Sequence, residues 1–165
     1  MDGISYGLMS DFVNKYITVK NLSICDVGSL DINGTYKPLF EGYSYTGVDI
    51  VEGQNVDVVS KDLYQYPFVD KAFDIVISGS TIEHIEDIFR WVKELARIVK
   101  KGGLVCIIGP SMFRNIHQHP IDCWRIYPDG MRYLLDKVAG LEVLEVRRSK
   151  LSGKIVMCMG IGRKI

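Results

Sequence analysis

Two turns about twenty residues apart carry the clearest chemistry in this sequence. The run ICDVGS at 24–29 has the pattern of a buried strand ending at Gly28 and Ser29, and the run YTGVDI at 45–50 delivers Asp49. In an open α/β sheet, the first strand-to-helix turn lets a nucleotide-like ligand approach the backbone, and an acidic residue after the second strand can bind ribose hydroxyls. The two turns together predict a site for a nucleoside cofactor.

A second group of reactive side chains lies in the aperiodic stretch 110–127, where His119 precedes Asp122 by three residues. Imidazole has an unperturbed pKa of about 6.5, so His119 with Asp122 is a candidate general base. His84 is a second candidate, with a structural role at the start of a helix as its alternative. The loop group also has ligands that a metal could use. A loop core in which Asp122 pairs with Arg125 needs no ion, and we predict no metal site.

The hydrophobic pattern predicts the sheet that would position these groups. Apolar runs of strand length alternate with helical patterns, which is typical of a mainly parallel sheet covered on both faces. Helical spacing predicts three helices, at 6–16, 85–99 and 128–139, the second ended by the glycines at 102–103. Strands are predicted at 23–27, 45–50, 56–59, 73–78, 104–109, 141–147 and 154–161. Ser152 and Gly153 join the last two strands as a hairpin.

Composition narrows the class of protein further. The 165 residues, 47% of them hydrophobic, suit a single globular domain over 1–165. The formal net charge is zero, so we expect neither nucleic acid nor membrane as a partner. The basic clusters at 97–101 and 147–150 are interpreted as solvated ends of elements. Four cysteines without a CxxC pair, and the lack of any signal-like or membrane-length apolar run, predict a cytoplasmic location.

The order of the motifs resembles class I S-adenosylmethionine-dependent methyltransferases. The matching runs are DVGS at 26–29, GVD at 47–49, DL at 62–63, PF at 67–68, FDIV at 73–76, IEHI at 82–85 and KGGL at 101–104. The resemblance implies a Rossmann-like, doubly wound, mainly parallel seven-stranded sheet with an antiparallel last strand and helices on both faces. It also implies S-adenosylmethionine as the cofactor. The first turn departs from the family's Gly-x-Gly-x-Gly, since only Gly28 falls in the usual place.

The resemblance also implies roles for individual positions. Asp26 matches the acidic residue that opens the first motif, Asp49 the one that binds the ribose, and Asp62 the one that meets the adenine amino group. A turn or cap aspartate, or an ordinary tight turn at Gly28, is the structural alternative. The full set of predicted cofactor contacts is Asp26, Gly28, Ser29, Asp31, Asn33, Asp49, Ile50, Asp62, Leu63, Ser78 and Gly79.

The run HQHPIDCWRIYPDG at 117–130 resembles a subset of small bacterial and phage methyltransferases, many of them linked to glycan pathways. It implies a small-molecule or glycan-type acceptor. Our mechanistic hypothesis is methylation at oxygen, with His84, or His119 with Asp122, as the catalytic base. In so short a chain, we expect the acceptor to be bound by this loop, by the first helix or by a partner subunit. A homodimer would provide such a partner subunit. Two other interpretations stay open: a non-catalytic cofactor-binding regulatory subunit, and a nicotinamide-dependent oxidoreductase, which would need a G-x-G-x-x-G turn that this chain lacks.

Overall fold

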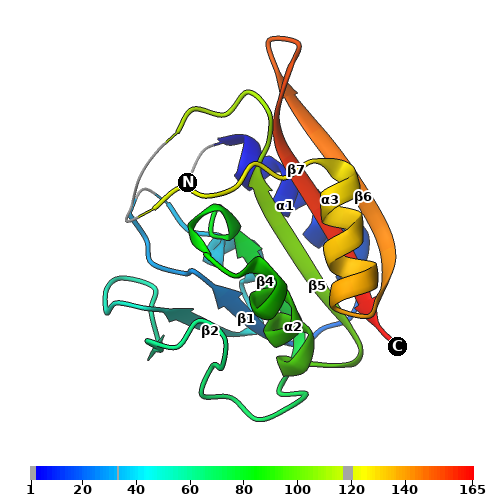
Figure 1. Cartoon of the computed structure of the whole chain (residues 1–165). Helices are drawn as coiled ribbons and strands as arrows, with labels where there is room; N and C mark the ends of the chain where they lie inside the picture. Colours follow the sequence, from blue (N-terminus) through cyan, green and yellow to red (C-terminus); the bar gives the residue numbers. More distant parts are fainter. Residues whose placement is uncertain (1–2, 33, 117–120) are drawn as a thin grey trace.

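The computed structural model describes residues 3–32, 34–116 and 121–165, and these form one sheet with helices on both sides (Figure 1). The strand order is β3-β2-β1-β4-β5-β7-β6. The bounds are β1 Ser23–Val27, β2 Ser44–Asp49, β3 Val58–Val59, β4 Phe73–Gly79, β5 Val99–Pro110, β6 Leu141–Leu151 and β7 Lys154–Lys164. The first five strands pair in parallel, and β7 runs antiparallel to both β5 and β6. The predicted fold class is confirmed.

Three α-helices cover the sheet in the described chain: α1 Gly3–Tyr16, α2 Ile88–Ile98 and α3 Pro128–Tyr133. α1 lies on one face and α2 and α3 on the other (Figure 1). Phe12 of α1 is fully buried in the same cluster as Ile75, whereas Trp91 of α2 and Met131 of α3 are buried in the cluster on the opposite face with Val76. Neighbouring residues of β4 thus point into different cores, as the period of two in a strand requires.

The second helix differs from the prediction at both ends. Ile82–His84 form a 3-10 turn, η2, and α2 begins only after Asp87, whose side chain accepts a hydrogen bond from the Arg90 N–H at 3.0 Å. At the other end the predicted glycine stop is wrong. The chain is already extended at Val99, and Gly102, with φ of 79°, lies within the first part of β5, where the register with β4 shifts.

The carboxyl end of the chain largely follows the prediction. α3 begins at Pro128 and continues into a π-helical turn, η3, at Leu134–Val138. β6 and β7 are longer than predicted, and their connection at Ser152 and Gly153 has positive φ at both residues, as a tight hairpin turn requires. No helix in the described ranges is both long and apolar enough to cross a bilayer.

Candidate functional site

A cavity of ≈ 1050 Å³ opens where the parallel strands end. The carboxyl ends of β1, β2 and β4 meet at one edge of the sheet, so the turns that follow them come together there. Small-molecule sites are commonly about 300–1,000 Å³, so this cavity has room for more than one small ligand. The predicted site residues that line it are Asp26, Gly28, Ser29, Asp49, Ile50, Leu63, Gly79 and His84.

The turn after β1 is tied to β2 and leaves no room for a side chain at Gly28. The N–H groups of Gly28 and Ser29 both donate to the Val48 carbonyl oxygen, at 2.9 and 3.2 Å. Gly28 has φ of 80°, and a β-carbon there would lie 2.1 Å from Thr81 Oγ1. Both the backbone conformation and the space therefore require glycine. The Ser29 hydroxyl is buried on the side of Gly47, so Ser29 reaches the cavity through other atoms.

Asp49 is held in a fixed orientation at the end of β2. Its Oδ2 accepts the Leu30 N–H at 3.0 Å, and its Oδ1 accepts the Ile50 N–H at 2.7 Å. The residue is half-buried and lines the cavity. An ionised carboxylate has about four acceptor positions, so two remain for hydroxyl groups of a ligand. The geometry suits the recognition of neighbouring hydroxyls, as on a ribose.

Asp26 is a second carboxylate at the same end of the cavity, and it is only 3% exposed. Burial raises the pKa of Asp26 to about 7, against the hydrogen bond that the Tyr45 hydroxyl donates to it, while the charge of Asp49 raises it further. A cation bound between these two carboxylates would favour the ionised form of Asp26. This end of the cavity is therefore suited to a ligand that combines hydroxyls with a positive charge.

The wall beside this end comes from the loop before β4. Leu63, Tyr64 and Tyr66 line the cavity, and the tyrosines are bound by the N-cap residue of α2 and by α2 itself. The Tyr64 hydroxyl accepts the Asp87 N–H at 3.2 Å, and the Tyr66 hydroxyl accepts from Trp91 Nε1 at 3.0 Å. The wall is thus held at several points along the helix.

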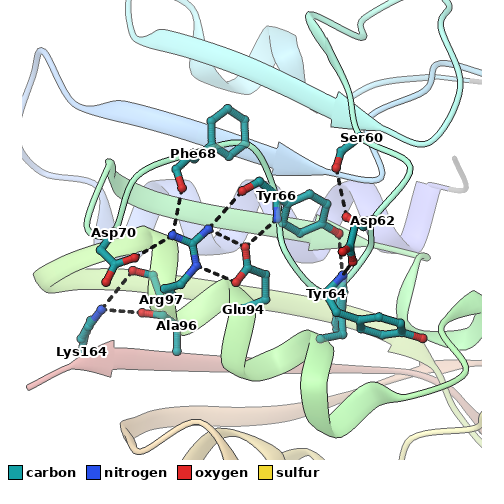
Figure 2. A network of polar contacts seen from close by, with 11 residues as sticks. Ser60, Asp62, Tyr64, Tyr66, Phe68, Asp70, Glu94, Ala96, Arg97 and Lys164 are labelled. Atoms are coloured by element: carbon teal, nitrogen blue, oxygen red, sulfur yellow. Dashed lines mark hydrogen bonds and ion pairs between the residues drawn. The ribbon is translucent and has the colours of Figure 1, made fainter.

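One arginine makes most of the polar contacts that hold the end of this loop (Figure 2). Arg97 on α2 uses all five of its donor positions: to Glu94 Oε2 at 2.7 Å, Glu94 Oε1 at 2.7 Å, Tyr66 O at 3.1 Å, Phe68 O at 2.9 Å and Asp70 Oδ1 at 2.7 Å. Glu94, 5% exposed, also accepts the Tyr66 N–H at 2.7 Å. We call Arg97, Glu94 and residues 66–70 the Arg97 clamp. The interpretation of Arg97 as a solvated helix end is wrong.

Several predicted cofactor residues do not line the cavity. Asp62 is exposed, and its carboxylate accepts the Tyr64 N–H at 2.8 Å in a local turn. The carboxylate of Asp31 accepts the Gly34 N–H at 2.6 Å, and the buried Ser78 hydroxyl donates to Val27 O at 2.7 Å. Asn33 lies outside the described residues. Cofactor contacts at these positions stay predictions.

His84 lines the cavity, and one hydrogen bond holds its ring. Its Nδ1–H donates to the Ile121 carbonyl oxygen, which fixes the ring and leaves Nε2 as the basic nitrogen of the neutral imidazole. Nε2 lies 3.9 Å from Oε1 of Glu83, whose side chain is 1% exposed. The two interpretations of His84 are therefore compatible, since the contact that anchors it also orients it.

Asp122 lies in a loop core beside the cavity. It forms a two-point ion pair with Arg125, in which Nη2 donates to Oδ2 at 2.7 Å, and its side chain is 1% exposed. Trp124 Nε1 donates to the Ile85 carbonyl oxygen at 2.7 Å. His119, its predicted partner, lies outside the described residues. A catalytic role for either residue stays a prediction, and no group of three metal-ligating side chains occurs among the residues that the structure describes.

Other cavity residues were not anticipated. Tyr36 is 5% exposed and hydrogen-bonds with Ser5 of α1, and a β-carbon at Gly79 would lie 2.0 Å from its hydroxyl oxygen. Nothing in its sequence context distinguishes Tyr36 from an ordinary core tyrosine. Glu83 and Arg114 also line the cavity, and only Glu83 had a signal, since it adjoins His84 in a recognised run.

Comparisons of sequence identify similar proteins. The family model described as a methyltransferase domain matches residues 25–107, which is half of the chain. The chain is 29% identical over 143 residues to 2-methyl-6-phytyl-1,4-hydroquinone methyltransferase 1, chloroplastic, of Oryza sativa subsp. japonica; the match covers 81% of the chain and 38% of that protein. It is 29% identical over 87 residues to a demethylmenaquinone methyltransferase of Chlorobaculum tepidum, covering 53% of the chain and 34% of that protein. The chain spans little more than a third of the length of these two relatives.

Solved structures show the same fold. The 1,6-didemethyltoxoflavin-N1-methyltransferase of Burkholderia thailandensis, solved with 1,6-didemethyltoxoflavin and S-adenosylhomocysteine, superposes with a TM-score of 0.76 at 15% identity and covers 99% of this chain and 79% of that one. A SAM-dependent methyltransferase of Aquifex aeolicus superposes with a TM-score of 0.67 at 17% identity, and the match covers 100% of both chains. At these identities the likeness establishes the fold alone.

Proposed function

The chain belongs to the methyltransferase domain family, and on this premise we propose that it transfers a methyl group from S-adenosylmethionine to a hydroxyl oxygen of a small-molecule acceptor. The observation that carries the proposal is Asp49, oriented by two backbone N–H groups over a cavity at the carboxyl edge of the sheet. The same cavity has His84 on its wall. A carboxylate suited to hydroxyl groups and an imidazole thus border the same cavity.

The residues of the cavity fit this cofactor. Asp49 would hold the ribose hydroxyls, the backbone of the turn at Gly28 would border the ligand, and Asp26 would balance positive charge. The chemistry that S-adenosylmethionine supplies when bound is a methyl carbon on a sulfonium sulfur, a good leaving group. The task left to the protein is to align the acceptor and exclude water.

The choice of oxygen as the methylated atom rests on His84. A hydroxyl acceptor has to lose its proton, and the anchored ring offers Nε2 to take it. The buried side chain of Glu83 lies 3.9 Å from that nitrogen and would help to hold the base in place. This arrangement is the reason to place the base at His84 and to treat His119 with Asp122 as the second candidate.

The acceptor side of the cavity favours a small, partly apolar molecule. Pro110, Ile121 and Met157 lie on this wall. The curated relatives named above carry a phytyl hydroquinone and demethylmenaquinone in their names, which supports an aromatic acceptor. A glycan-type acceptor, a homodimer and a cytoplasmic location remain predictions from the sequence. An acceptor panel of phenols, quinols and glycosides would test the first of these.

Two measurements test the proposal. Calorimetry should show that the protein binds S-adenosylhomocysteine and does not bind NAD. The reverse result would contradict the proposed methyl transfer. His84→Gln should keep the affinity for S-adenosylhomocysteine and lose methyl transfer by a factor of about 10²–10⁴, the usual contribution of a general base. If His84→Gln turns over normally and His119→Ala does not, the base belongs to the second candidate.

A further inference from the structure

The tip of the last hairpin and the loop after β5 form a common surface. The Ser111 N–H donates to the Val156 carbonyl oxygen at 2.9 Å, and the Phe113 N–H donates to that of Ile155 at 3.0 Å. The hairpin of β6 and β7 extends beyond the rest of the sheet (Figure 1). We call residues 111–116 and 148–156 the hairpin-tip patch.

This patch exposes large apolar side chains. The exposed fractions are 46% for Met112, 51% for Phe113, 76% for Ile116 and 53% for Leu151. Apolar side chains scattered singly over a surface need no explanation, but a group on two adjoining segments indicates an interaction site. A hollow of ≈ 380 Å³ lies within the group, lined by Phe113, Arg114, Asn115, Leu151 and Val156.

The patch is also cationic. Its two segments contain Arg114, Arg148, Lys150 and Lys154 and no acidic residue, in a chain whose formal net charge is zero. Arg148, Lys150 and Lys154 are exposed. Arg125 donates a hydrogen bond to the Asn115 carbonyl oxygen and pairs with Asp122. The Asp122 carboxylate is buried in this pair, so it does not offset the positive charge of the patch.

The patch adjoins the proposed acceptor side of the cavity. Arg114 lines both the cavity and the hollow of the patch. Pro110 and Met157, which line the cavity, are paired across β5 and β7 immediately next to the patch segments. A surface that bound the patch would therefore lie at the mouth of the cavity.

We propose that the hairpin-tip patch docks on an anionic lipid surface and presents the cavity to an acceptor held in that surface. Exposed apolar side chains among cations are the combination that inserts into the boundary of an anionic bilayer. An apolar protein partner would not need the cations, and nucleic acid would favour a basic groove with stacked aromatics. The part of the inference that concerns the acceptor rests on the proposed function. The part that concerns lipid binding rests on the residues of the patch alone.

Vesicle flotation tests the docking. The protein should float with phosphatidylcholine vesicles that contain phosphatidylglycerol and not with phosphatidylcholine alone, and added salt should weaken the binding. Lys150→Glu with Leu151→Ser should lower binding by about 25-fold or more, since each cation near such a surface contributes about a fivefold factor and a reversal of charge applies that factor twice.

The chain offers a matched control. Lys20→Glu with Val19→Ser changes an adjacent exposed cation and apolar residue before β1, at the other edge of the sheet, and should leave vesicle binding unchanged. No flotation with anionic vesicles, or equal loss in both double variants, would overturn the proposal. Both variants should bind S-adenosylhomocysteine like the parent chain. Failure of that binding in the parent chain would reject the proposed function without bearing on the vesicle result.

Discussion

The two regions that adjoin the cavity, the Arg97 clamp and the hairpin-tip patch, are built by opposite means. On the cofactor side, the Arg97 clamp satisfies every donor of a guanidinium and ties the loop at 66–70 to α2. On the acceptor side, the hairpin-tip patch leaves apolar side chains and cations facing outward. Rigid polar contacts suit a region that must bind the same cofactor at each turnover. Exposed apolar and charged groups suit a region that binds a surface. The comparison predicts that substitutions on the two sides will affect different quantities.

The largest loss should come from the clamp itself. Arg97→Ala leaves the nearly buried Glu94 carboxylate without its cation, so the free energy of unfolding should fall by about 3 kcal/mol. The loosened loop should also raise the KM for the methyl donor while the KM for the acceptor stays within about twofold. Chemical denaturation and steady-state kinetics measure the two effects. Arg132→Ala, at an exposed position, is the control. Equal losses of unfolding free energy in the two variants would show that the clamp does not stabilise the protein specifically.

The next loss concerns the turn after β1. Gly28→Ala brings a β-carbon against Thr81, and we expect an affinity for S-adenosylhomocysteine lower by about 100-fold, or roughly 2.7 kcal/mol. Gly42→Ala is the matched control, because Gly42 has φ of 85° and nothing within 4 Å of a β-carbon. It should cost about 1 kcal/mol of stability and no affinity. Calorimetry separates the two, and comparable affinity losses would show that backbone strain alone explains Gly28.

Asp26 should give the cofactor side a dependence of stability on pH. Its folded pKa of about 7 lies above the ordinary value of 3.8, so between these values the folded state holds a proton that the unfolded state has lost. The free energy of unfolding should therefore decrease as pH rises from about 4 to 7, with a contribution of a few kcal/mol at most. Asp26→Asn should flatten this part of the profile. Urea denaturation across the pH range checks it, and an unchanged slope in the variant would reject the assignment.

The smallest effect should come from the acceptor side. Phe113→Ser removes an exposed ring, so the free energy of unfolding should change by no more than about 0.5 kcal/mol, and the affinity for S-adenosylhomocysteine should not change. Thermal unfolding and calorimetry provide the measurements. A stability loss as large as that of Arg97→Ala would mean that the patch is part of the core. The difference between the Arg97 clamp and the hairpin-tip patch would then not hold.

The local hydrophobic pattern of the sequence predicted the positions of the strands. The apolar runs located the strands, and the glycine and carboxylate at their ends, Gly28 and Asp49, do line the cavity. The direction of a hydroxyl is a different matter. Ser78 and Gly79 are neighbours on β4, yet the Ser78 hydroxyl donates to β1 while Gly79 lines the cavity. The sequence does not say which of two adjacent residues lines the cavity.

Contacts between distant segments could not be predicted. Arg97 binds residues up to 31 positions away, and its place three residues before the pair Lys100 and Lys101 suggested a solvated end. The hairpin-tip patch was hidden in another way. The whole-chain charge is zero, so only the pairing of two segments across β5 and β7 reveals a region with cations and no acids. Net charge reports on the sum and not on its distribution.

The strand order has a consequence for synthesis of the protein. β7, at residues 154–164, lies between β5 and β6, so β6, although it is made earlier, can enter the sheet only after β7. While the ribosome still holds this segment, the edge of β5 stays open, and a nascent chain in that state offers unpaired backbone groups to its neighbours. Translation that pauses near residue 150 should therefore favour aggregation, and a chaperone that shields strand edges should act at that moment.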